Sequence, residues 1–189
     1  MSLFRLAAAL VAIATLALPA FGQEDAVGIP GPISFQETDF ALAWTSHPFP
    51  AYFKQEYLPE GETVEAYNQM FMVDVLTEGG TPETTAADVI AGLEERKAND
   101  PVVNYAMVAN DATGELILDF LVSDSSTGTI IVEWNAYRYV PYGEGFVLYA
   151  ISRRAYGDLA SDFIGGLKDW RTASISALAS MELPDVQLD

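Results

Sequence analysis

Apolar and polar side chains alternate over four consecutive segments in the second half of the chain, and short turn sequences separate these segments. Because successive side chains of a strand point to opposite faces, this alternation predicts four β-strands. The connecting turns are rich in Gly, Asn, Asp and Ser and are too short for a parallel crossover, so we expect an antiparallel meander. The four segments are residues 102–110, 115–124, 129–140 and 146–156.

The segment 129–140 divides most clearly into two faces. One face is apolar, and the other carries an acid, an amide and two phenols. Arg138 breaks the pattern, because its position falls on the apolar face. The apolar face consists of Ile130, Val132, Trp134, Ala136 and Val140, and the polar face of Ile131, Glu133, Asn135, Tyr137 and Tyr139.

Two helices are predicted, one before the meander and one after it. Thr81 and Pro82 start the first helix, since a hydroxyl at the N-cap and a proline at the first helical position favour initiation. Apolar residues then recur at helical spacing until the stop signal at 99–101. The second helix begins at 157–158 and continues to about Met181.

The part of the chain before the first helix is predicted to contain short strands and one ambiguous stretch. Residues 63–77 fit either a helical turn over 64–68 followed by a strand at 69–77, or a single helix, and periodicity does not separate the two. Pro48 and Pro50 have no N–H to donate, so they exclude a central strand at 47–50, where we expect a turn. The other expected elements are extended segments at 33–39 and 40–46, a turn at 47–50 and a strand at 51–58.

The first 22 residues are predicted to be a signal peptide. Arg5 supplies a positive charge, residues 6–18 are apolar, and Ala20 and Gly22 fit a cleavage site before Gln23. The apolar run is shorter than the roughly 20 residues that span a bilayer. We therefore expect a periplasmic or secreted protein with no membrane span after cleavage, and an uncleaved N-terminal anchor is the alternative.

The rest of the chain is predicted to be one domain with a disordered beginning. Residues 23–32 are rich in Gly, Pro and acid and lack periodicity, which is typical of a disordered mature N-terminus. Residues 33–189 contain neither an internal repeat nor a long linker. They are expected to form a single α+β domain, in which an antiparallel sheet meander packs with two main helices.

Composition disfavours several classes of function. The chain has 27 acidic and 9 basic residues and a formal net charge of −18, which opposes binding to nucleic acid. With no cysteine and one histidine, ordinary zinc, copper and haem sites and a lipoprotein anchor are ruled out. The acidic turns at 111–115 and 124–128 lack a complete calcium-loop pattern. We therefore expect no cofactor and no metal.

The polar face of the segment 129–140 is the first candidate site. We assume that Phe120 pairs with Trp134 across the preceding turn. Asp119 then falls opposite Asn135, on the face that carries Glu133. The resulting patch consists of Asp119, Glu133, Asn135, Tyr137 and Tyr139.

Two acids held at a set separation are the groups that glycoside hydrolysis and general acid/base catalysis use. Two structural readings compete with this one. The patch is a solvated outer face, which antiparallel sheets commonly have, or a face that other parts of the chain cover.

Arg138 is the second candidate. A buried unpaired charge is very costly, so its guanidinium needs a partner. One reading is an arginine paired inside the fold. The other is an anion-binding residue in a cleft between sheet and helix, together with Arg153 or Arg154.

The order of elements, with a helix capped at Thr81 and Pro82, a long meander and a terminal helix, resembles the PsbP-like α/β/α sandwich. The segments 57–62 and 67–71 are also similar to exported bacterial proteins of unknown function. The resemblance implies a fold and an accessory or binding role, and it brings no catalytic residues with it.

We therefore expect a noncatalytic periplasmic domain that binds an envelope protein or a small ligand. The main alternative is a hydrolase that uses Asp119 and Glu133. A third reading is a folded structural protein of the envelope.

Overall fold

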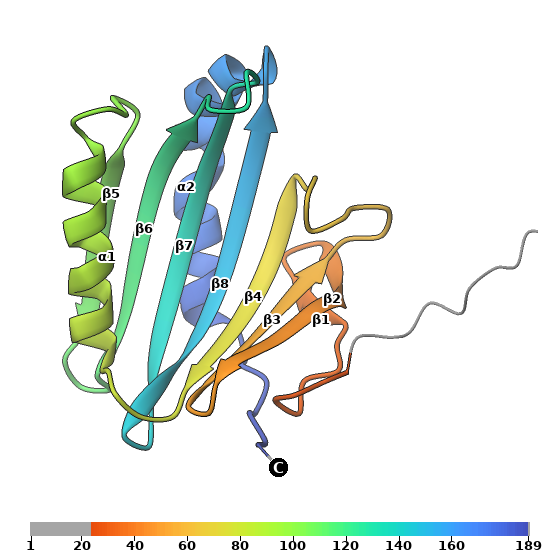
Figure 1. The fold of residues 1–189 in the computed structure, drawn as a ribbon, viewed down its shortest axis with the longest axis vertical. Coiled ribbons are helices and arrows are strands. Elements are labelled where there is room, and N and C mark those ends of the chain that lie inside the picture. The colour runs from red at the N-terminus through yellow and green to blue at the C-terminus, as the bar shows by residue number, and fades with distance from the viewer. Residues whose placement is uncertain (1–23, 189) are drawn as a thin grey trace, which may run out of the picture.

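One antiparallel sheet of eight strands, in the order β1-β2-β3-β4-β8-β7-β6-β5, forms the centre of the molecule (Figure 1). The computed structural model describes residues 24–188, and the expected signal peptide at 1–22 lies outside them. The strands are β1 (Ile33–Phe35), β2 (Thr38–Phe49), β3 (Tyr52–Leu58), β4 (Gln69–Leu76), β5 (Asn104–Asn110), β6 (Glu115–Asp124), β7 (Ile131–Tyr142) and β8 (Gly145–Tyr156). The helices are α1 (Pro82–Arg96) and α2 (Leu159–Ser180).

The sheet consists of two meanders that meet at one long-range strand pair. Strands β1 to β4 pair with their neighbours in sequence, and so do strands β5 to β8. Strand β4 then pairs with β8 along its whole length, from Gln69 opposite Arg153 to Leu76 opposite Phe146. The β4–β8 pair therefore makes one sheet of the two halves.

Each face of the sheet packs against one helix and has its own apolar core. Helix α1 contacts β6 and β7 on one face, and α2 contacts β6, β7 and β8 on the opposite face (Figure 1). We call these the α1 face and the α2 face. Trp134 and Ile151 are buried in the core of the α2 face, and Leu118 and Tyr139 in the core of the α1 face.

The α+β class, the antiparallel meander and both predicted helices are confirmed. Helix α1 begins as its sequence indicates. The Thr81 hydroxyl accepts a hydrogen bond from the Thr84 N–H, and the Thr84 hydroxyl accepts one from the Thr81 N–H. Pro82 occupies the first helical turn, where no intrahelical donor is needed.

Two predictions before α1 are partly wrong. The strand at the end of 63–77 is confirmed as β4, but a tight turn closed by a bridge between Thr63 and Ala66 replaces the expected helical turn. Strand β2 also continues through Pro48, where we expected a turn. Strand β1 pairs with β2 only as far as Phe40, so the proline lies where β2 has no partner on that side and needs no donor.

The expected disorder at 23–32 is wrong for residues 24–32. Val27 and Ile29 are buried in the core of the α2 face. The Asp25 carboxylate accepts hydrogen bonds from the backbone N–H groups of both residues. The segment packs as irregular coil fixed by side-chain and backbone hydrogen bonds, and such coil has no periodicity for a pattern analysis to detect.

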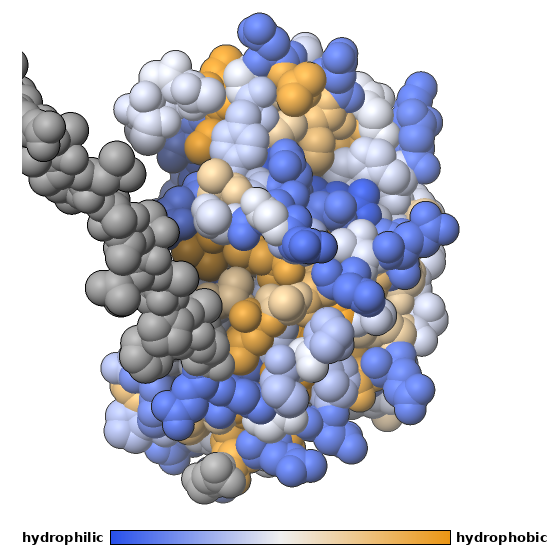
Figure 2. Space-filling view, turned by 90° about the vertical axis from the view of Figure 1, so that its right-hand side faces the viewer, coloured by the Kyte–Doolittle hydropathy of each residue, from blue (hydrophilic) through white to orange (hydrophobic). Residues whose placement is uncertain are grey.

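The edge of the sheet that is formed by β1 to β3 faces the viewer in Figure 2. Apolar residues form a band across this side, between hydrophilic regions above and below it (Figure 2). Neither helix of the described chain combines the length and the apolar character that crossing a membrane requires.

The close approach of β4 and β8 predicts that a side chain at Gly145 destabilises the fold. A Cβ on Gly145 would overlap the carbonyl oxygen of Leu76 and lie 2.7 Å from its carbon. Gly145→Ala should therefore lower the free energy of unfolding by roughly 2–3 kcal/mol, as overpacking does. Gly92→Ala is the control, because its Cβ meets nothing within 4 Å in helix α1. It should raise stability by up to about 1 kcal/mol in urea unfolding. Equal effects of the two substitutions would contradict the role of Gly145.

Candidate functional site

The residues singled out from the sequence do not form one site. The β6–β7 register pairs Phe120 with Asn135, one residue away from the pairing with Trp134 that we assumed. A shift of one residue moves a side chain to the other face of the sheet. Asp119 therefore lies on the α2 face, while Glu133 lies on the α1 face, and the two carboxylates cannot share a substrate. The pair expected for a hydrolase is thus wrong.

Asp119 serves to attach α2 to the sheet. Its Oδ2 accepts a hydrogen bond of 2.6 Å from Nε of Arg171 in α2 and one of 3.3 Å from Nε1 of Trp134. The carboxylate is buried, and its charge is met by the guanidinium. A cavity of about 530 Å³ lies beside this pair, between α2 and the sheet. Because Asp119 is already paired, it offers little to a ligand there.

Arg138 lies on the apolar α2 face, as its position in the strand predicted, and it is paired inside the fold. Its Nε donates to Oε2 of Glu115 at 2.9 Å, and its Nη2 lies 2.8 Å from the same oxygen in an ion pair. Its Nη1 donates to the carbonyl oxygens of Leu178 at 2.8 Å and Met181 at 3.4 Å. Helix α2 has no basic residue in its last turn, so Arg138 supplies the cation at its C-terminus.

Arg153 lies on the same face but forms a separate contact. Its guanidinium lies 4.8 Å from the centre of the Trp170 ring, and its Nη2 donates to Oε1 of Gln36 at 2.6 Å. Burial lowers the pKa of Arg153. Arg138 and Arg153 therefore each contact α2 or the segment after it, and no anion site joins them.

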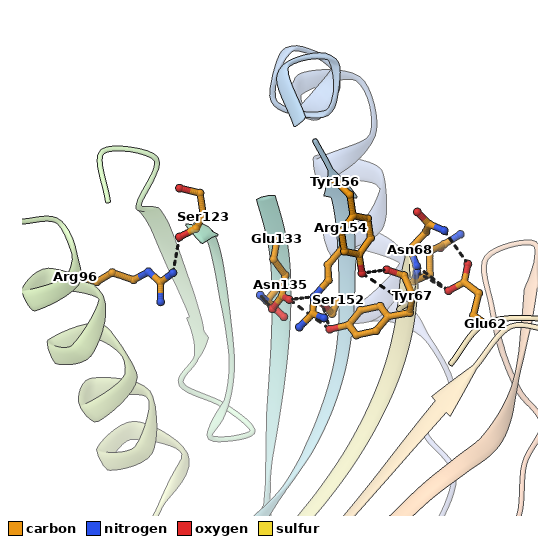
Figure 3. A network of polar contacts seen from close by, with 11 residues as sticks. Glu62, Tyr67, Asn68, Arg96, Ser123, Glu133, Asn135, Ser152, Arg154 and Tyr156 are labelled. Atoms are coloured by element: carbon orange, nitrogen blue, oxygen red, sulfur yellow. Dashed lines mark hydrogen bonds and ion pairs between the residues drawn. The ribbon is translucent and has the colours of Figure 1, made fainter. Parts of the chain in front are cut away.

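The polar residues of β7 contribute to a network at one end of the α1 face (Figure 3). Glu133 accepts hydrogen bonds from Nδ2 of Asn135 at 2.8 Å, from the Tyr67 hydroxyl at 3.3 Å, and from Arg154. The Arg154 guanidinium also lies over the Tyr67 ring, 4.1 Å from its centre. Of the readings offered for this face, the one in which other parts of the chain cover it is confirmed, since Asn135 is only 1% exposed.

The other end of the α1 face contains a pocket of about 330 Å³. Its walls are mostly apolar and rich in aromatic residues, and they come from six elements of the fold. One charged residue, Asp74, lies among them. The lining residues are Phe49, Tyr52, Asp74, Leu76, Thr85, Val89, Tyr137, Tyr139, Phe146 and Leu148.

Asp74 is buried in this pocket with half of its hydrogen-bonding capacity unused. Only 7% of the residue is exposed. Its Oδ2 accepts a hydrogen bond of 2.6 Å from the Tyr52 hydroxyl, and its Oδ1 has no partner among the described residues. Lys54 is its cross-strand neighbour, but the Lys54 ammonium pairs with Glu56 at 3.0 Å. Asp74 is therefore a buried acid without an ion pair in residues 24–188.

The environment of Asp74 changes its chemistry. Burial raises the pKa of Asp74 to about 6, and the neighbouring Lys54 and the Tyr52 hydrogen bond limit the rise. The carboxyl group is thus mostly ionised at neutral pH, and its negative charge lies in the pocket wall without an ion-pair partner in residues 24–188. Pockets that bind small molecules have this composition, with apolar walls and a few placed polar groups.

Sequence reasoning missed Asp74, although a signal was present. The residue interrupts the apolar run of β4, where an acid on a central strand has no solvated face. Of the residues proposed from the sequence, Tyr137 and Tyr139 line the pocket. In the described part of the chain, no three acidic or histidine side chains come together as a metal site would need.

The pairing of Arg138 predicts a loss of stability rather than of binding. Arg138→Met should leave the Glu115 carboxylate and two helix carbonyls without their donor, and lower the free energy of unfolding by roughly 3 kcal/mol. Lys97→Met is the control, because the Lys97–Glu94 pair lies on the surface and should matter little. Urea unfolding of both variants measures this, and similar effects of the two would contradict the structural role of Arg138.

The raised pKa of Asp74 predicts a pH-dependent gain in the variant Asp74→Asn. The folded protein holds this proton up to about pH 6, whereas the unfolded chain releases it near the ordinary value of 3.8, so ionisation in this window favours unfolding. The stability of Asp74→Asn relative to the wild type should therefore rise by roughly 2.5 kcal/mol between pH 4 and pH 7.5. All other acids are common to both proteins, so a difference that stays constant with pH would refute this account.

The chain was also compared with known proteins. No curated protein matches its sequence. A protein-family model matches residues 27–183, which includes every strand and both helices. The matched segment covers most of the chain, and the chain therefore belongs to this uncharacterised family.

Proposed function

We propose that this protein is a noncatalytic binding domain that holds a small, largely apolar molecule in the Asp74 pocket. The observation that supports this is a nine-tenths buried carboxyl group with one free oxygen in an aromatic, otherwise apolar wall. The pocket is bounded by strands and by helix α1, so its shape does not depend on long loops.

The energetics of Asp74 favour a binding role over a structural one. A buried charge without a partner is destabilising, and an apolar or amide residue at this position would avoid that cost. Destabilised groups of this kind are common at functional sites. A ligand with positive charge near the carboxylate would offset its desolvation.

Catalysis has less support. The candidate acids Asp119 and Glu133 lie on opposite faces and are both paired with arginines. The phenols nearest to Asp74 do not make a proton-transfer partner at neutral pH, because burial raises the pKa values of Tyr52 and Tyr139.

Two broader features complete the proposal. One helix on each face of an antiparallel sheet supports a relation to the PsbP-like sandwich. Arg5, the apolar run at 6–18 and the small residues Ala20 and Gly22 support export to the periplasm or beyond.

The proposal is tested by blocking the pocket. Benzylamine and benzyl alcohol, at millimolar concentration, should raise the melting temperature of the wild-type protein by mass action. Thr85→Trp should abolish the shift, because Thr85 lines the pocket and a larger side chain fills it. Ala87→Trp is the matched control in the same helix, on an exposed position outside the pocket lining. If neither compound binds, or if the shift survives in Thr85→Trp, the pocket is not the binding site.

A further inference from the structure

The aromatic residues of the Asp74 pocket indicate which class of ligand it binds. We infer that the pocket recognises a methylated or quaternary ammonium group, which the aromatic rings surround and the Asp74 carboxylate neutralises. This inference rests on the proposed function and adds the class of ligand to it.

The pocket contains the rings of an aromatic cage. Five of its lining residues are aromatic, and they come from β2, β3, β7 and β8. Their planes are inclined to one another: the Tyr137 and Tyr139 rings meet at 69° with centres 6.2 Å apart, and those of Tyr139 and Phe146 at 68° with centres 5.3 Å apart. Phe49 stacks on Tyr52 at 5.4 Å. Ring faces set at such angles can contact one compact group from several sides.

A cation gains more from this pocket than a neutral or anionic group. The face of an aromatic ring carries partial negative charge and attracts cations, and the attraction grows when water is excluded. The free Oδ1 of Asp74 adds a full charge nearby. A neutral ligand would leave that carboxylate without an ion pair, and an anion would be repelled. The net charge of −18 also concentrates cations around the whole protein.

Methylation of the ammonium follows from the shortage of acceptors. A primary ammonium carries three N–H donors, and each needs an acceptor once it is buried. Apart from Asp74, the polar side chains of the lining are the Thr85 hydroxyl and the tyrosine phenols, and the Tyr52 hydroxyl already donates to Asp74. A methylated ammonium has few or no N–H groups to satisfy, and its methyl groups match apolar walls.

The cation is not supplied by the described part of the chain itself. Lys54, the basic residue next to Asp74 in the sheet, directs its ammonium to Glu56. No lysine or arginine is among the residues that line the pocket. The acid and its rings are therefore free to receive a cation from outside.

The decisive comparison uses choline and its neutral analogue 3,3-dimethyl-1-butanol, in which carbon replaces nitrogen. By calorimetry, the wild-type protein should bind choline at least about tenfold more tightly than the alcohol, as an added charge contact implies. Asp74→Asn should reduce this preference to about threefold or less. Phe49→Leu should weaken the binding of choline but not that of the alcohol. Phe49 is half-exposed, so the fold should tolerate the substitution.

The control variant is Asp119→Asn, which removes one negative charge from the opposite face of the sheet and should leave the preference for choline unchanged. Thermal unfolding of each variant checks that it folds. Equal binding of choline and the alcohol to the wild type would overturn the ammonium inference and leave the apolar-ligand proposal in place. If choline, the alcohol and the benzyl compounds all fail to bind, both proposals are wrong.

Discussion

The pairing of β4 with β8 is the contact on which the rest of the structure depends. Hairpins build each half of the sheet locally, but only this pair joins the two halves. The strands approach so closely at Leu76 that only glycine fits at position 145. The same pairing places Asp74 directly opposite Leu148, next to the aromatic residues of β7 and β8. A long-range backbone contact thus creates both the continuous sheet and the pocket on its α1 face.

The buried acids differ in how fully their oxygens are hydrogen-bonded. Asp100 accepts hydrogen bonds from Arg96, Ser123 and the Val102 backbone, and Asp119 accepts them from Arg171 and Trp134. These contacts tie the C-terminal end of α1 and the middle of α2 to the sheet. Such satisfied groups need no further explanation, since buried polar atoms are normally paired. Asp74 differs from both, because one of its oxygens has no partner in residues 24–188. This destabilised carboxylate lies in the wall of an aromatic pocket.

The position of Asp74 links stability to recognition in one residue. Burial favours its neutral form, and a bound cation would favour the ionised form. Protonation of Asp74 would therefore weaken the binding of a cation in this pocket, so stability and cation affinity would respond to pH in opposite ways. Helix α1 provides Thr85 and Val89 to this pocket, and its capping box fixes where the helix begins. Local helix chemistry at Thr81 thereby sets the position of one pocket wall.

The sequence by itself determined the meander, the two helices and the isolated arginine on an apolar face. These features depend on side-chain alternation, turn residues and helix caps, which act over a few neighbouring residues. It did not determine the β6–β7 register, because the loop between Asp124 and Ile131 permits more than one alignment, and a one-residue error placed Asp119 on the wrong face. It also did not reveal that Val27 and Ile29 enter the core, or that Asp74 faces a pocket. These outcomes were decided by tertiary structure alone, since they require strands and coil that are distant in sequence to meet in space.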